Sequence, residues 1–266
     1  MKIQALTRKS HFWNEDRFIV GNNYWIVIDG ATPLIKKNNE NLARYMVDYI
    51  KKNIDKYKGR IKDRLIKLSS DLYDELKLVS NDAAYKPSAS LAYVELIDEV
   101  FYVGVLGDCE VTIKTNNNEI IRCFKDDLSK LDAISLTRLQ EEASKRNINV
   151  KDARKYIIDT LIKHRRLINQ SGGYQAYTIS DNLEFREYSF SIESKKVKEI
   201  YLYSDGFSAS FQQLKIYDKH EDLFKHTLDI KLEVEKIVKT AFSDGNCNKY
   251  PRFKKIDDIT IIQIIN

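Results

Sequence analysis

The chain has 266 residues, of which 43% are hydrophobic and 31% charged, and this apolar content excludes an intrinsically disordered protein. The 44 basic residues exceed the 39 acidic ones by a net charge of +5, which falls short of the basicity of a dedicated nucleic-acid binder. No apolar run reaches the roughly 20 residues that span a bilayer and no signal peptide begins the chain, so we expect a cytoplasmic protein with neither a nucleic acid nor a membrane as partner.

Nine glycines and three prolines punctuate the chain without forming a linker, so we expect residues 1–266 to form a single domain. In chain order, the patterns predict strands at 17–20 and 24–28, helices at 41–57 and 60–79, strands at 91–97, 100–106, 110–115 and 119–124, a helix at 137–168 with a break near 147–149, strands at 185–190 and 199–203, a helix at 231–242 and a last strand at 259–265. Asn22-Asn23 and the three asparagines at 116–118 favour tight hairpins, hence antiparallel pairing. Blocks of helices between blocks of strands predict an α+β fold.

The segment from Lys36 to Lys67 is rich in basic residues with aromatic residues among them. One interpretation is a surface for an acidic partner, which would make the chain a basic interaction protein. The favoured interpretation is two amphipathic helices with solvated charges, because apolar residues such as Met46, Ile50, Leu65 and Leu68 recur at helical spacing.

Carboxylates stand at the ends of several predicted strands, and each one alone is typical of a turn. They are Glu15, Asp16, Asp29, Asp108, Asp205 and the pair Asp257-Asp258. If these strands pack in one sandwich, the acids gather at one edge, where two carboxylates about 5 Å apart repel by roughly 3 kcal/mol at an effective dielectric of about 20. Bound cations would relieve that repulsion, and oxygen ligands without histidine or cysteine favour Mg²⁺ or Mn²⁺. Two such ions can activate water and neutralise a phosphoryl group.

Six blocks in sequence order resemble the metal-dependent protein phosphatase 2C family. They are residues 14–18 (NEDRF), 27–31 (VIDGA), 87–92 (PSASLA), 103–109 (VGVLGDC), 203–207 (YSDGF) and 256–262 (IDDITII). An Asp-Gly pair alone carries no information, but the order and spacing of the blocks cover nearly the whole chain.

The resemblance implies a four-layer α-β-β-α sandwich, in which two antiparallel sheets are flanked by helix pairs and two Mg²⁺ or Mn²⁺ ions lie at one edge. It implies that Asp29 bridges both ions and that the Gly30 carbonyl binds one of them. It also makes Asp205 and Asp257 direct ligands, Glu15 and Asp16 second-metal or water-mediated ligands, and Asp108 part of a weaker third metal site.

The sequence departs from the family pattern at three places. His11 stands where many members carry an arginine that grips the substrate phosphate, so we expect either His11 or a nearby cation, Arg8, Lys9 or Arg17, to do so. Ala31 replaces the histidine of eukaryotic members, and Ala209 replaces an acid that often supports the third metal. Elsewhere, His164-Arg165-Arg166 favours a solvated helix end over a catalytic group.

The resemblance implies a serine/threonine phosphoprotein phosphatase that acts through a metal-activated hydroxide and opposes a serine/threonine kinase. The residues assigned to catalysis are Asp29, Asp205, Asp257 and His11. The alternative is a phosphatase-like module that binds phosphoproteins or a partner without turnover, which the changes at His11 and Ala31 suggest. The retained acids favour the enzyme, because a module without catalysis has no reason to keep mutually repelling carboxylates.

Overall fold

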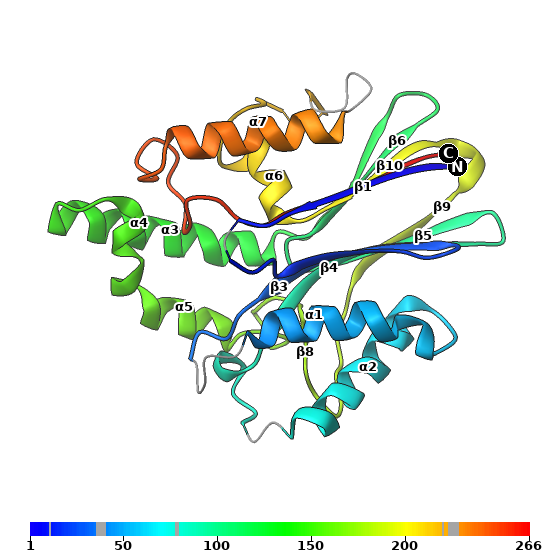
Figure 1. Ribbon diagram of the computed structural model, residues 1–266, viewed down its shortest axis with the longest axis horizontal. Helices are drawn as coiled ribbons and strands as arrows, with labels where there is room; N and C mark the ends of the chain where they lie inside the picture. Colours follow the sequence, from blue (N-terminus) through cyan, green and yellow to red (C-terminus); the bar gives the residue numbers. More distant parts are fainter. Residues whose placement is uncertain (11, 36–40, 78–79, 220, 223–228) are drawn as a thin grey trace.

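We describe a computed structural model of the chain, which covers residues 1–10, 12–35, 41–77, 80–219, 221–222 and 229–266. Two antiparallel sheets lie face to face, and helices cover both outer faces (Figure 1). The expected four-layer α+β sandwich is therefore confirmed. None of the helices in the described ranges is both long and apolar enough to cross a membrane.

The first sheet has the strand order β1-β11-β10-β6-β7. Its strands are β1 (Lys2–Arg8), β6 (Glu110–Thr115), β7 (Ile120–Cys123), β10 (Val197–Tyr203) and β11 (Ile259–Ile265). Lys2 pairs with Ile265, so the two ends of the chain lie side by side at one end of the sheet. Asn118 adopts the left-handed conformation, with a φ of 61°, in the predicted hairpin between β6 and β7.

The second sheet has the strand order β2-β3-β4-β5-β9, with the short β8 paired to β4. Its strands are β2 (Asp16–Val20), β3 (Tyr24–Ala31), β4 (Ser88–Ile97), β5 (Val100–Leu106), β8 (Tyr177–Thr178) and β9 (Tyr188–Glu193). The β2–β3 hairpin places Asp16 directly opposite Asp29, and β4 places Ser90 on the other side of Asp29.

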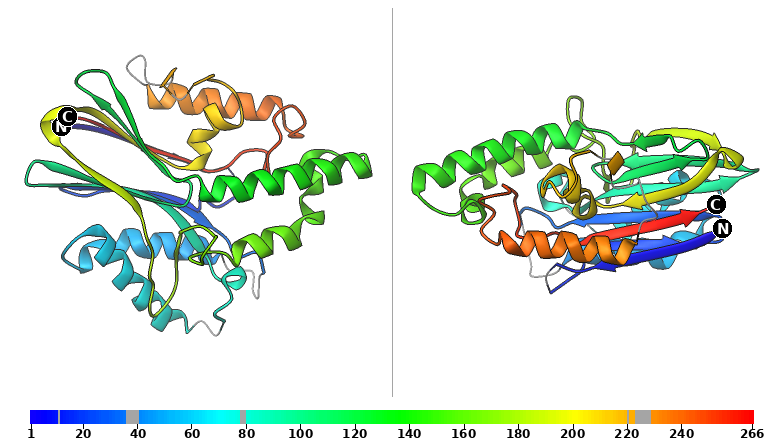
Figure 2. Two further views of the ribbon diagram at one scale, coloured as in Figure 1. Left: turned by 180° about the vertical axis from the view of Figure 1, so that it is seen from behind. Right: turned by 90° about the horizontal axis from the view of Figure 1, so that it is seen from above.

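Helices α1 (Leu42–Asn53) and α2 (Ile61–Leu76) cover the second sheet, and α6 (Asp205–Gln212) and α7 (Ile230–Ser243) cover the first. Helices α3 (Asp127–Arg146), α4 (Val150–Ala153) and α5 (Ile158–Arg165) extend beyond the sheets at the end away from the chain termini (Figure 2). We call residues 127–165 the helical insertion. Short 3₁₀ turns occur at Ile54–Lys56, Ala83–Tyr85, Arg154–Tyr156 and Ser194–Lys196.

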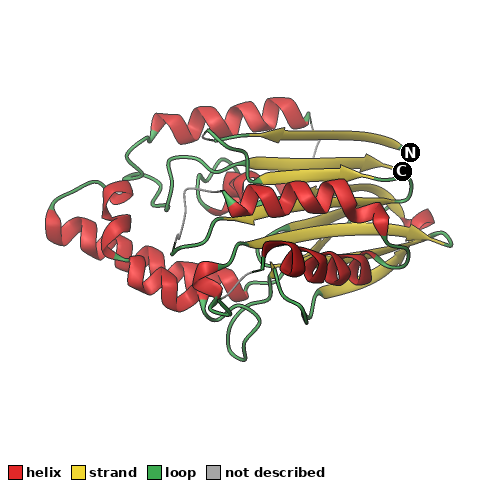
Figure 3. Cartoon of the chain, turned by 60° about the horizontal axis from the view of Figure 1, so that its bottom comes forward, coloured by secondary structure: helices red, strands yellow, loops and turns green. Residues whose placement is uncertain are grey.

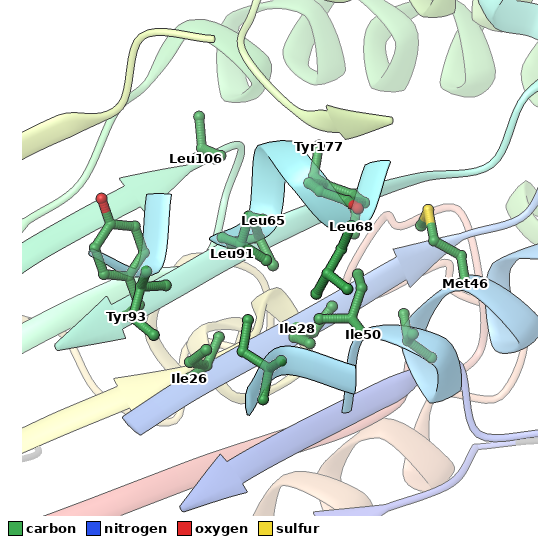
Figure 4. Close-up of a cluster of buried hydrophobic side chains, with 14 of the residues drawn as sticks. Ile26, Ile28, Met46, Ile50, Leu65, Leu68, Leu91, Tyr93, Leu106 and Tyr177 are labelled. Atoms are coloured by element: carbon green, nitrogen blue, oxygen red, sulfur yellow. The ribbon is translucent and has the colours of Figure 1, made fainter. Parts of the chain in front are cut away.

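The apolar residues of α1 and α2 form the buried faces of two amphipathic helices, as predicted. Met46 and Ile50 from α1 and Leu65 and Leu68 from α2 are fully buried against the second sheet (Figure 4), and the two helices lie along it in Figure 3. A second cluster, which includes Trp25, fills the space between the sheets. The described charges of the basic segment therefore lie on the outer faces of these helices, as the favoured interpretation predicted; residues 36–40 lie outside the described ranges.

Three differences from the predicted elements have physical causes. The alternating, largely exposed segment that forms β1 was not predicted, because little of its surface is buried. Helix α3 begins at Asp127, ten positions before the predicted start, in a stretch whose weak apolar periodicity leaves Ile134 49% exposed. Strand β9 lies three positions later than predicted, and Phe185 packs in the core outside it.

The most consequential difference is α6. Asp205-Gly206 suggested a turn at the end of a strand, whereas Asp205 is the first residue of a helix that has Ser204 at its N-cap position. Gly206 is needed for close packing, because a Cβ atom there would lie 1.9 Å from the Asp258 carbonyl oxygen. The glycine thus brings the start of α6 against the start of β11.

Candidate metal centre

The predicted acids from both sheets meet at the edge of the sandwich nearest the helical insertion. Asp29 at the end of β3, Asp108 after β5, Asp205 at the start of α6 and Asp257 before β11 line one cavity of about 470 Å³, together with Glu15 and Gly30. The strand order explains this convergence, since the chain leaves or enters each of these elements at the same edge.

Burial and mutual repulsion act on the acids together. Burial raises the pKa of Asp29 well above its usual range, and the charges of Asp16, Asp205 and Asp108 raise it further. Burial likewise raises the pKa of Asp205, with added repulsion from Asp257 and Asp108. These directions are those of carboxylates held together without enough positive charge nearby.

Asp16 lies just below the cavity floor, opposite Asp29, and is 1% exposed. Burial, followed by repulsion from Asp258, raises the pKa of Asp16 to about 7. One oxygen of Asp16 and one oxygen of Asp205 are buried without a hydrogen-bond partner. Buried carboxylate oxygens without partners are costly, so both atoms are suited to receive a cation.

Glu15 reaches the cavity from the loop before β2 and is held there by hydrogen bonds. The Thr32 hydroxyl donates to Glu15 Oε1 over 2.6 Å, and the Asn41 amide donates to the same atom over 2.7 Å. The Gly30 amide donates to the Glu15 carbonyl over 3.1 Å, and a Cβ atom at Gly30 would lie 2.6 Å from that carbonyl oxygen. Glycine is therefore required where the two metal-site segments cross.

The neighbouring acids Asp257 and Asp258 have different places, which the sequence did not distinguish. Asp257 lines the cavity, whereas Asp258 is buried beneath it. Asp258 accepts hydrogen bonds from the Ser10 amide and hydroxyl at 2.6 and 2.7 Å and from the Glu15 amide at 2.6 Å. Asp258 thus ties the loop that carries Glu15 to the start of β11.

Lys254 supplies positive charge to the acids and was missed by the sequence analysis. Its Nζ atom lies 2.8 Å from Asp257 Oδ1, and its side chain is 42% exposed. Burial lowers the pKa of Lys254, but attraction to Asp257, Asp205 and Asp29 outweighs this effect and raises it overall. The only sequence signal was the three-residue spacing to Asp257, which is common on protein surfaces.

The helical insertion contributes a basic wall on the opposite side of the cavity. Arg154, His164 and Arg165 line it, which corrects the expectation that His164-Arg165-Arg166 is only a solvated helix end; Arg166 is exposed and pairs with Asp82. The His164 ring contacts the Ser135 hydroxyl at 2.9 Å. Arg165 donates to the Ser88 hydroxyl over 3.1 Å. No motif marked these residues, because basic residues on helices are usually solvated.

Three of the residues expected to bind phosphate, Arg8, Lys9 and Arg17, do not line the cavity. His11 lies outside the described residues. Arg17 faces α1, where its Nε atom donates to Asp48 over 2.6 Å, so it does not serve the cavity. Arg8 and Lys9 are exposed and do not line the cavity.

The acids fit hard divalent cations by their chemistry, because the donors are carboxylate oxygens and two of those oxygens are buried without partners. Within the described ranges, no group of three or more acidic, histidine or cysteine side chains forms a finished metal-binding arrangement. Lys254 accounts for part of this, since it takes one oxygen of Asp257.

The fold matches solved structures of bacterial phosphatases. The serine/threonine phosphatase Stp1 from Staphylococcus aureus superposes with a TM-score of 0.57 at 14% identity, over 100% of this chain and 94% of that one. The catalytic domain of the phosphatase PstP, solved with two manganese ions, gives 0.54 at 13% identity over 98% and 96%. PppA from Pseudomonas aeruginosa gives 0.56 at 12% identity over 98% and 96%. No family model and no curated protein matches the chain.

The chain thus has the fold of the bacterial serine/threonine phosphatases, which confirms the resemblance seen in the six sequence blocks at the level of the fold. The comparison covers almost the entire chain and almost the entire length of each phosphatase.

Proposed function

We propose that the chain is a metal-dependent serine/threonine phosphoprotein phosphatase, with residues 1–266 as its single catalytic domain. The observation that carries the proposal is the gathering of Asp29, Asp108, Asp205 and Asp257, from both sheets, in one cavity at the edge of a phosphatase fold. A purely structural role does not explain why burial and neighbouring acids raise the pKa of Asp29, Asp108 and Asp205.

In this proposal the ions are two Mg²⁺ or Mn²⁺, held by Asp29, Asp205, Asp257 and the Gly30 carbonyl, with Glu15 and Asp16 in supporting positions and Asp108 at a weaker third site. When bound, such ions neutralise phosphoryl charge and lower the pKa of water to make a nucleophile at neutral pH.

The protein's own groups position the site. The hydrogen bonds from Thr32 and Asn41 fix Glu15, and Asp258 anchors the loop before β2. Asp16 stands opposite Asp29 in the β2–β3 hairpin, and its charge raises the pKa of Asp29. A phosphorylated serine or threonine enters from the open side, between the acids and the basic wall of the helical insertion. The substrate is a phosphoprotein, and a serine/threonine kinase would make it.

A second candidate is a phosphatase-like module that binds without turnover. The Lys254–Asp257 ion pair favours it, because a lysine in a metal site can replace an ion permanently. The two candidates make different predictions about hydrolysis but not about phosphate binding.

The deciding experiment is hydrolysis of a phosphothreonine peptide by the full chain with Mg²⁺, with Mn²⁺ and with EDTA. If the chain is an enzyme, we expect phosphate release with either ion and no release with EDTA. Metal binding is followed separately by the rise in melting temperature. Folded protein that binds Mn²⁺ but releases no phosphate above background would support the binding module and contradict the enzyme.

A further inference from the structure

The cavity has an acidic wall and a basic wall, and the basic wall contains an arginine with a buried nitrogen that has no hydrogen-bond partner among the described residues. Arg154 begins the 3₁₀ turn Arg154–Tyr156, directly after α4, and its side chain lines the cavity. Its Nε atom is buried and has no hydrogen-bond partner. A guanidinium offers five N–H donors and stays charged, so leaving one buried without an acceptor is costly.

Three other cations of the cavity have hydrogen-bond or ion-pair partners within the protein, and Lys255 lies 4.0 Å from the centre of the Phe242 ring. Arg252 donates to Asp244 and to backbone carbonyls, including that of Ala241 at 2.9 Å. Arg165 donates to Ser88, and Lys254 pairs with Asp257. Arg154 differs from Arg165 and Arg252 because its buried Nε atom has no hydrogen-bond partner.

Charged groups of both signs surround Arg154, and the attraction of Asp257 is larger than the repulsion of Arg165. Burial lowers the pKa of Arg154 and nearby Arg165 lowers it further, whereas Asp257 opposes both. Asp257 already gives one carboxylate oxygen to Lys254. Arg154 and Arg165 lie on the same wall of the cavity, and an anion that enters beside them would supply an acceptor for the unpartnered Arg154 Nε atom.

A phosphate group suits this position by shape and charge. Guanidinium binds phosphate oxygens through two parallel N–H donors. These charge-assisted hydrogen bonds are stronger in a partly buried site than at the surface. A cavity of about 470 Å³ is large enough for a phosphorylated side chain. The acids on the opposite wall repel a phosphate unless cations intervene, so the phosphate would lie toward the helical insertion.

We propose that Arg154 binds the phosphate group of the substrate from the helical insertion. Arg165, held by Ser88, supports it from the next helix. This inference rests on the proposed function for its substrate class, but the anion site itself does not depend on turnover.

The test compares Arg154→Gln with Lys155→Gln, which removes the same charge from an exposed neighbour on the same turn. Binding of inorganic phosphate is measured by calorimetry in the presence of Mg²⁺, and KM and kcat are measured with a phosphothreonine peptide. Loss of a charge-assisted hydrogen-bonding partner predicts phosphate affinity at least about tenfold weaker in Arg154→Gln, with KM raised more than kcat is lowered. Lys155→Gln should stay within about twofold of the wild type.

The melting temperature without phosphate separates a binding role from a structural one. Because Arg154 Nε lacks a partner, Arg154→Gln should melt at or above the wild-type temperature, whereas a residue needed for folding would lower it. If Arg154→Gln fails to fold, Arg154→Lys decides, since lysine keeps the charge but not the paired donors. Phosphate affinity in Arg154→Lys equal to that of the wild type would overturn the proposal.

The outcomes keep this inference apart from the proposed function. A wild type that binds phosphate through Arg154 but hydrolyses no peptide supports the anion site and contradicts the phosphatase. An active wild type whose phosphate affinity and KM are the same in Arg154→Gln supports the phosphatase and overturns the role of Arg154. Equal weakening by Arg154→Gln and Lys155→Gln would show only a general effect of charge and would also overturn it.

Discussion

Lys254 Nζ lies 2.8 Å from Asp257 Oδ1, so the protein places one of its own cations among the acids that we assign to metal binding. The ammonium also attracts Asp205 and Asp29, which raises the pKa of Lys254. Repulsion among the acids is thus partly relieved before any ion binds. A metal ion that uses this oxygen of Asp257 must displace the lysine.

Replacing Lys254 should therefore strengthen metal binding while weakening the metal-free protein. We expect Lys254→Met to melt a few degrees lower without metal and to bind Mn²⁺ severalfold more tightly, since a partly exposed ion pair is worth about 1 kcal/mol or less. Lys239→Met, which changes an exposed lysine of α7 that does not line the cavity, serves as the control. Titration of the melting temperature with Mn²⁺ measures both effects, and an unchanged Mn²⁺ affinity would mean that Lys254 does not compete with the ion.

Replacing Asp205 should have the opposite effect on the metal-free protein. Asp205→Asn removes one of the repelling charges, so the metal-free variant should melt higher than the wild type. A hundredfold excess of metal over Kd should raise the wild type's free energy of unfolding by roughly 2.7 kcal/mol. This corresponds to a rise in its melting temperature on the order of 5 to 10 °C. In Asp205→Asn this rise should shrink. A variant that keeps the full rise would show that Asp205 is not a ligand.

The adjacent acids Asp257 and Asp258 provide a matched pair. Asp258→Ala removes three hydrogen bonds to the loop before β2 and should destabilise the protein by about 2 to 4 kcal/mol with or without metal. Asp257→Ala should change the unfolding free energy little but weaken Mn²⁺ binding. Chemical denaturation with and without Mn²⁺ distinguishes them, and the reverse pattern would exchange their assigned roles.

The basic wall contains a carboxylate that should make stability depend on pH. Burial and then Asp108 raise the pKa of Asp132 to about 7 from 3.8, against the opposing effect of Arg165. Between about pH 4 and 7, Asp132 is therefore protonated in the folded chain and ionised in the unfolded chain. Raising the pH through this window lowers the free energy of unfolding, and the loss is complete above the folded pKa.

Asp132→Asn should remove that part of the pH dependence. The variant and the wild type should have similar melting temperatures near pH 4, and the variant should melt progressively higher toward pH 8. Asp152→Asn, at an exposed position in α4, should follow the wild type. A constant difference between Asp132→Asn and the wild type across this range would contradict the assigned pKa.

The local patterns of the sequence predicted the α+β class and the acids at the strand ends, whereas the sandwich was implied by the resemblance of the six blocks. Alternating or continuous apolar runs mark β3, β4 and β11, and Asp29 and Asp108 follow such runs. The roles of Lys254, Arg154 and Asp258 could not be predicted, because they depend on which way a side chain points once distant segments meet. Helix α6 was missed for a similar reason: Gly206 looks like a turn residue until the backbone of Asp258 is seen against it.

The central claim is that Asp29 and its neighbours hold the ions that hydrolyse a phosphoester, and it is tested most directly by the kcat of Asp29→Asn with a phosphothreonine peptide and saturating Mn²⁺. We predict a kcat at least about a hundredfold below that of the wild type, in a variant that remains folded, because the substitution weakens the site that activates water and neutralises phosphoryl charge. Equal kcat in Asp29→Asn and the wild type would contradict the assignment of this cavity as the metal centre.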